Sequence, residues 1–338
     1  MIRVVNLTKR FGRTTAVDNL SFEVNRGEVV GFLGPNGAGK TTTMRIISGF
    51  LQATGGTVTV AGIDVFRESY EVRRRIGYLP ENVPIYTDMR VSEYLRYRGR
   101  LKGLRGRKLR SRVHDVMEAC DLTAARRSII GRLSKGFRRR VGLADSLVHE
   151  PDVLILDEPT IGLDPSQVRN FRCLIKEFAR HHTILLSSHI LQVVETLCER
   201  VLIIDKGRLV ASDRPENLIG LMKGSARVVI EIRGEREAVL AEIPRVPGVA
   251  SMTCETSGDW HRVTCACVPG TDAREALFRA VAGKGWTLRE MSIEKGNLED
   301  VFIALTGVNS NGKAAGAAAA AVSGGAAEPA TPADGGEA

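Results

Sequence analysis

Long apolar runs are missing from this sequence of 338 residues. The longest candidates are short segments such as Val153 to Leu156, far below the roughly 18 residues that span a bilayer. Residues 1–10 include Arg3, Lys9 and Arg10 and have no apolar stretch of signal-peptide length. We therefore expect a cytosolic protein whose chain does not cross a membrane.

Cysteine and aromatic residues are also scarce. The six cysteines are scattered, with only Cys265 and Cys267 close together, which argues against a zinc site or a disulfide framework. Aromatic residues make up 5% of the chain, which leaves few side chains for stacking on nucleic-acid bases. The hydrophobic share of 43% and the charged share of 26% are those of a globular protein and exclude wholesale disorder.

Acidic residues are outnumbered in the first two thirds of the chain. Residues 1–225 carry 37 Lys and Arg against 24 Asp and Glu, whereas residues 226–338 carry 11 against 15. Much of the excess lies between Arg96 and Arg112, a run without an acidic residue. Such a run is typical of a solvated helix surface or of contact with nucleic acid or acidic lipid, and we favour the helix surface because aromatic residues are few.

The order of sequence patterns predicts an α/β domain followed by smaller units. Within residues 1–225, short apolar runs alternate with helical patterns, which favours a parallel sheet buried on both faces, and residues 88–145 are expected to form a helical insertion. The strands are expected at Val29–Leu33, Val153–Leu156, Thr183–Leu186 and Val201–Ile204, and a helix at Thr41–Ser48.

The C-terminal third is different in character. Residues 226–307 predict a small α+β accessory domain, with alternating strands at Val228–Ile232 and His261–Val268. Helix starts are expected where Asp272 precedes Glu275 and where Asn297 precedes Asp300. Residues 308–338 are mostly Ala, Gly, Ser and Pro and predict a disordered tail.

A glycine-rich phosphate loop is the strongest local signal. The sequence matches G-x-x-x-x-G-K-[ST] between an expected strand and an expected helix, so backbone amides and a helix N-terminus would surround phosphate oxygens. Lys40 would neutralise phosphate charge, and the Thr41 hydroxyl would bind Mg²⁺. The candidate phosphate-binding residues here are Gly34, Pro35, Asn36, Gly37, Ala38, Gly39, Lys40, Thr41 and Thr42.

Two acids follow an expected buried strand at Val153–Leu156. Asp157 and Glu158 therefore lie at the carboxyl edge of the sheet, where open α/β sheets bind their ligands. A nucleotide triphosphatase needs a carboxylate for its metal ion and a group that orients or deprotonates the attacking water. Asp157 is the candidate metal ligand, and Glu158 is the candidate general base for that water.

At this point the sequence resembles the ATP-binding subunits of ABC transporters. Four further features carry the resemblance: Leu133-Ser134-Lys135-Gly136-Phe137 is similar to the family's signature motif, Gly162-Leu163-Asp164-Pro165 to its D-loop, His189 to its switch histidine, and Phe11 to the aromatic residue that stacks on adenine. The resemblance covers residues 2–225. It implies a P-loop NTPase fold of ABC ATPase type, with a mixed sheet core, a β subdomain and a helical insertion.

The resemblance also implies a mechanism with ATP and Mg²⁺ as cofactors. Two subunits would form a head-to-tail dimer, in which each ATP lies between one phosphate loop and the partner's signature motif. Ser134, Gly136 and Asp164 would contact nucleotide across that interface, and His189 would hydrogen-bond the γ-phosphate and act with Glu158 and Lys40 in catalysis.

Departures from the family pattern indicate which branch of the family this sequence resembles. Glu81 replaces the usual glutamine after Ile76-Gly77-Tyr78-Leu79-Pro80, and it would either contact the metal or turn toward a membrane partner. This loop, the Lys135 and Phe137 variants of the signature, and the ending Gly296-Asn297-Leu298-Glu299-Asp300-Val301-Phe302 look like ATPases of ABC-2-type exporters, including gliding-motility-associated and multidrug branches. Such a subunit works as a homodimer or heterodimer with separate membrane-spanning permease subunits, on the inner face of the cell membrane.

Two alternatives stay open. A soluble ABC-type ATPase could act on nucleic acid or ribosomes through Arg96 to Arg112, although the chain lacks the second ATPase unit or the long coiled coil of such relatives. A nucleotide sensor without hydrolysis is disfavoured because Glu158 and His189 are both present.

Overall fold

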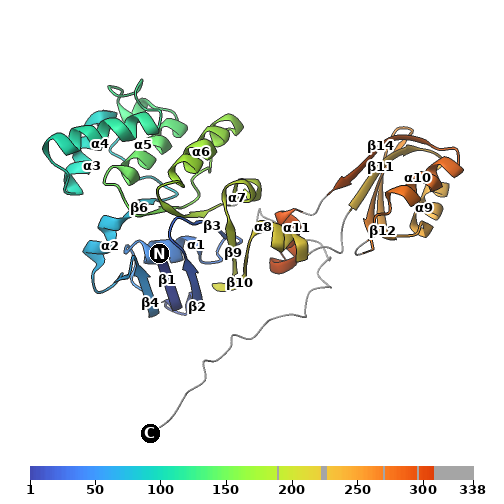
Figure 1. The fold of residues 1–338 in the computed structure, drawn as a ribbon, viewed down its shortest axis with the longest axis horizontal. Coiled ribbons are helices and arrows are strands. Elements are labelled where there is room, and N and C mark those ends of the chain that lie inside the picture. The colour runs from blue at the N-terminus through green and yellow to red at the C-terminus, as the bar shows by residue number, and fades with distance from the viewer. Residues whose placement is uncertain (189, 222–226, 269–270, 295–296, 308–338) are drawn as a thin grey trace, which may run out of the picture.

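A computed structural model describes residues 1–188, 190–221, 227–268, 271–294 and 297–307 (Figure 1). The residues in these ranges form three β-sheets. Within these described ranges, no helix is both long enough and apolar enough to cross a membrane.

The central sheet has six strands in the order β10-β9-β3-β8-β7-β6. Its neighbours are parallel except β10, which runs antiparallel to β9. The four strands predicted from apolar runs are confirmed, two of them with the expected bounds. The strands are β3 (Val29–Leu33), β6 (Ile76–Leu79), β7 (Val153–Leu156), β8 (Thr183–Ser187), β9 (Arg200–Asp205) and β10 (Arg208–Asp213).

Both faces of the central sheet are buried, which explains its continuous apolar runs. Val153 and Ile155 of β7 pack on one face with helix α1 (Lys40–Ile47) and the second sheet, while Leu154 and Leu156 pack on the other with the helical insertion. The second sheet is antiparallel and contains, in the order β2-β1-β4-β5, Thr14–Val24, Ile2–Phe11, Gly55–Val60 and Ile63–Asp64.

The helical insertion connects the neighbouring strands β6 and β7. The buried carboxylate of Asp145 connects the last helix of the insertion to the first. It accepts a hydrogen bond from Arg98 Nε at 3.0 Å and lies 3.3 Å from both Lys102 Nζ and the Tyr94 hydroxyl. The insertion contains α3 (Val91–Leu101), α4 (Gly106–Ala119), the short 3₁₀ helix Ile130–Arg132 and α5 (Lys135–Leu147). Outside it lie α2 (Ser69–Arg75), α6 (Pro165–Phe178), α7 (Leu191–Leu197) and α8 (Pro215–Leu221).

The third sheet forms a separate unit with its own core. Its strands, in the order β12-β13-β11-β14, are Val249–Ser257, Trp260–Cys267, Arg227–Arg233 and Thr287–Glu294, and its helices are α9 (Arg236–Glu242), the 3₁₀ turn Ile243–Arg245 and α10 (Arg274–Gly283). Asp272 lies one residue before the N-cap of α10 and accepts the Arg274 amide, so the predicted start is shifted by one position.

The last helix, α11 (Leu298–Thr306), does not belong to that unit. Asn297 caps it reciprocally with Asp300, as predicted. Its apolar face, however, packs with α7 and α8 in the core of the central sheet, and Glu195 of α7 accepts the Leu298 amide at 2.6 Å (Figure 1). The expected single domain of residues 226–307 therefore needs correction, because its final helix returns to the first domain. The tail predicted at residues 308–338 lies outside the described residues.

Candidate nucleotide site

The phosphate loop joins β3 to α1, as its motif predicts. Gly37 and Gly39 adopt φ values of +81° and +99°, which side chains disfavour. A Cβ atom at Gly39 would come within 2.4 Å of the Ala16 carbonyl oxygen, so this turn requires glycine. Helix α1 starts directly afterwards at Lys40, one residue earlier than expected.

Lys40 is held inside this loop. Its Nζ donates to the carbonyl oxygens of Gly34 at 2.6 Å and Pro35 at 3.1 Å. Burial lowers the pKa of the Lys40 ammonium, while the carboxylates of Glu158 and Asp157 oppose that shift. A buried cation next to several amides is suited to exchanging its carbonyl partners for phosphate oxygens.

Asp157 connects the phosphate loop to two strands. Its Oδ1 accepts from the Ser187 hydroxyl at 2.8 Å and from the Thr41 hydroxyl at 3.3 Å. Its Oδ2 is buried without a hydrogen-bond partner among the described residues. Burial raises the pKa of this carboxyl group, and the two hydroxyl groups oppose that shift. An unpartnered carboxylate oxygen beside a threonine hydroxyl fits a Mg²⁺ ion, which prefers oxygen ligands.

Glu158 occupies a strained backbone position at the same edge. Its φ is +47°, and its amide donates to Ser187 Oγ at 2.8 Å. The residue is buried, and its charge acts on Lys40. Its effect on Lys40 shows that the Glu158 carboxylate lies close enough to the phosphate loop to act electrostatically there.

A buried arginine of α5, Arg139, donates hydrogen bonds to the backbone around both candidate acids. Arg139 donates from Nε to the Pro159 carbonyl at 3.1 Å and from Nη2 to the Asp157 carbonyl at 3.2 Å. It also donates to the carbonyls of Glu81 and Glu158. One side chain thus links the helical insertion, the Glu81 loop and the backbone of both candidate acids.

The signature residues form a second group around the start of α5. The Ser134 hydroxyl caps this helix by accepting the Phe137 amide at 3.3 Å, and Gly136 packs so closely on Gln167 that a Cβ would come within 2.4 Å of Oε1. Asp164 is exposed and caps α6, accepting the Gln167 amide at 2.8 Å. The start of a helix attracts anions through its backbone amides, so the start of α5 is suited to an anion.

The remaining predicted residues take several positions. Phe11 is 50% exposed at the end of β1, and Lys9 Nζ lies over its ring, 4.9 Å from the ring centre. Asn36 lies exposed on the phosphate loop, Ala38 is buried and donates its amide to the Pro35 carbonyl, and Thr42 is half-buried in α1. Glu81 has an exposed side chain. His189 lies outside the described residues.

Sequence reasoning did not single out Ser187 or Arg139. Ser187 ends the apolar run of β8, which pairs with β7. A hydroxyl group at the end of such a buried strand could have indicated a partner for Asp157. Arg139 lies among three consecutive arginines, where sequence alone does not show which one is buried.

The fold and this site define a P-loop ATPase. The sequence model described as "ABC transporter" matches residues 17–161. A daunorubicin resistance ATP-binding protein, DrrA2, of Streptomyces coeruleorubidus is 37% identical over 90% of this chain and 95% of its own length. Nod factor export ATP-binding protein I of Ralstonia nicotianae is 35% identical over 91% of this chain and 94% of its own. A solved ATP-binding subunit of an ABC transporter superposes with a TM-score of 0.61 and 28% identity, covering 66% of this chain and 93% of that one.

The chain therefore belongs to the ABC transporter family, as an ATP-binding subunit with ATPase activity. The predicted fold class is confirmed.

Proposed function

We propose that this chain is the ATP-hydrolysing subunit of an ABC-2-type exporter, peripheral on the inner face of the cell membrane and coupled to separate permease subunits. The observation that carries the proposal is the convergence of Asp157, Thr41 and Ser187 beside the buried Lys40 and Glu158. The two relatives named for resistance and export support the transport role, and the chain matches nearly their whole lengths.

In the proposed reaction, residues of this chain position ATP and move one proton. The phosphate-loop amides and Lys40 hold the β- and γ-phosphates, and Phe11 stacks on the adenine ring. Thr41 and Asp157 would hold Mg²⁺, which supplies charge neutralisation at the phosphates when bound. Glu158 accepts a proton from water as the water oxygen bonds to the γ-phosphorus and the bond to the bridging oxygen breaks. His189 holds the γ-phosphate, and Glu81 adds negative charge near the metal or faces the permease.

The second part of the proposal is a head-to-tail dimer, formed by two copies or with a related ATPase. Ser134 and Gly136 at the start of α5, together with Asp164, would face the ATP bound by the partner. The support is the exposed position of Ser134 at the start of α5 and the close packing of Gly136 on the Gln167 side chain of α6. A bulky side chain at Ser134 would keep that helix start away from the phosphate by steric overlap.

Size-exclusion chromatography with Mg-ATP tests the dimer. Glu158→Gln should elute as a dimer because it binds ATP without turning it over, while Glu158→Gln with Ser134→Arg should remain a monomer. Ser257→Arg in the same background is the matched control, since Ser257 is exposed in the C-terminal sheet, and it should dimerise. An ATP-loaded Glu158→Gln chain that stays monomeric would contradict the proposed interface.

A further inference from the structure

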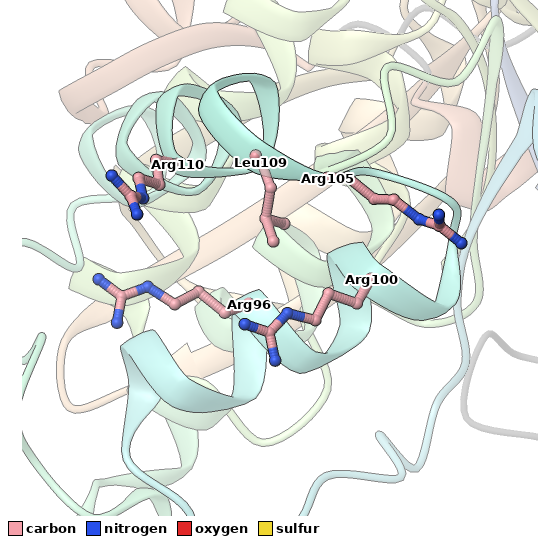
Figure 2. Close-up of a pocket in the computed structure, with 6 residues that line it drawn as sticks. Arg96, Arg100, Arg105, Leu109 and Arg110 are labelled. Atoms are coloured by element: carbon pink, nitrogen blue, oxygen red, sulfur yellow. The ribbon is translucent and has the colours of Figure 1, made fainter.

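The helical insertion contains a cavity of about 870 Å³ between α3 and α4. This volume lies within the range of small-ligand sites. In Figure 2, Arg96 and Arg110 reach toward the same end of the groove, and Leu109 points from α4 toward α3. The residues lining the cavity are Arg96, Arg100, Arg105, Gly106, Leu109 and Arg110.

Several other cations of the same run are paired with carboxylates. Arg98 and Lys102 share the buried Asp145, and Arg112 contacts Asp115 and Glu150. Within the part of the chain that the structure describes, the four lining arginines form no ion pair. Their charges are therefore available to an anion from outside.

The start of α4 adds positive potential to the cavity. Gly106 is the first residue of this 14-residue helix, the N-cap Arg105 makes no capping hydrogen bond through its side chain, and the first turn has no acidic residue. Helix starts with unsatisfied amides attract anions. In Figure 2, Arg96 and Arg110 lie at one end of the cavity and Arg105, beside the helix start, at the other, so positive charge extends along the cavity and favours an anionic group such as a phosphate.

Apolar side chains adjoin the charged ones. Leu109 is 5% exposed at the floor of the cavity. A smaller cavity of about 80 Å³ shares Arg96 and Arg110 and is also lined by Val113 and Met117. A ligand that fits both cavities combines a phosphate group with an apolar portion.

We propose that the α3–α4 cavity binds the phosphate group of an anionic phospholipid, so that the helical insertion itself contacts the membrane surface. Nucleic acid fits less well, because no Phe, Tyr or Trp lines either cavity and single-stranded binding sites use such residues for stacking. The proposal deepens the membrane association in the proposed function. It involves neither ATP nor the permease, so its failure would leave the ATPase assignment intact.

Vesicle sedimentation of the full chain tests this site. The wild type should sediment with vesicles of phosphatidylglycerol and phosphatidylcholine and not with phosphatidylcholine alone. Arg96→Gln with Arg100→Gln should bind about 30-fold more weakly, since each basic residue contributes roughly fivefold at an anionic surface. Its ATPase activity should be unchanged, because neither residue lies in the nucleotide site.

The control removes the same charge elsewhere. Arg67 and Arg107 are exposed and line neither cavity, so Arg67→Gln with Arg107→Gln should bind within about threefold of the wild type. Equal loss in both double variants would show diffuse attraction and overturn the site. Full displacement of the protein from vesicles by millimolar inorganic phosphate would identify a free anion as the ligand. Tighter binding to duplex DNA than to the vesicles would identify nucleic acid. Either result would overturn the lipid assignment.

Discussion

Arg139 offers a sharp test of how the helical insertion is connected to the catalytic edge. The side chain is 4% exposed and donates to four backbone carbonyls, those of Glu81, Asp157, Glu158 and Pro159. Arg139→Met keeps the approximate length of the side chain and removes every donor. The Glu158 carbonyl would keep the Ile161 amide as a donor at 3.2 Å. Each buried carbonyl that is left without a partner costs about 1 to 3 kcal/mol, partly offset because a buried charge disappears.

We expect Arg139→Met to lower the free energy of unfolding by about 3 kcal/mol, a large share of the 5 to 15 kcal/mol typical of a folded protein. The turnover number for ATP should fall more than the affinity for ATP changes, because the backbone around Glu158 loses the hydrogen bonds from Arg139. Urea unfolding followed by circular dichroism measures the first effect, since both tryptophans, Trp260 and Trp286, lie in the C-terminal unit and would not report it.

The neighbouring Arg140 provides the control. Its guanidinium pairs with the exposed Asp121 and lies 5.5 Å from the centre of the Phe137 ring, so Arg140→Met should cost no more than about 1 kcal/mol. If Arg139→Met were no more destabilising than Arg140→Met, the proposed connection would be refuted.

Two further predictions concern buried titratable groups. Burial lowers the pKa of His149 to about 3, and its Nε2 lies 3.0 Å from the Ile76 carbonyl oxygen. The unfolded chain therefore takes up the proton first as pH falls below about 6.5, and stability should drop by about 2 kcal/mol between pH 7 and pH 5. His149→Gln should flatten that dependence in pH-dependent urea titrations, and an unchanged slope would contradict the assignment. Asp157→Asn should abolish Mg²⁺-dependent hydrolysis without lowering the melting temperature, because burial already disfavours the charged carboxylate; a cooperative loss of folding would count against this reasoning.

The strands and the phosphate loop could be predicted because their signals are local. An apolar run of four or five residues, such as that of β7, is enough to indicate a strand buried on both faces, and Gly39 and Lys40 stand at fixed spacing after β3. Asn297 and Asp300 likewise indicate a helix start from four residues alone.

Long-range packing could not be predicted in the same way. The position of α11 depends on Glu195 and on apolar residues of α7 and α8, about 80 to 100 residues earlier in the chain. The strained backbone of Glu158 and the burial of Arg139 between its two arginine neighbours arise only when the insertion and the sheet are assembled.

The most direct test of the central claim is phosphate release from Mg-ATP by the purified chain and by its Glu158→Gln variant, with ATP binding measured in parallel. The account predicts that the wild type turns over ATP, and that the variant binds ATP but hydrolyses it at least about 100-fold more slowly, as expected when a general base is removed. A variant with unchanged turnover would contradict the assignment of Glu158 as the base and, with it, the proposed reaction at this edge of the sheet.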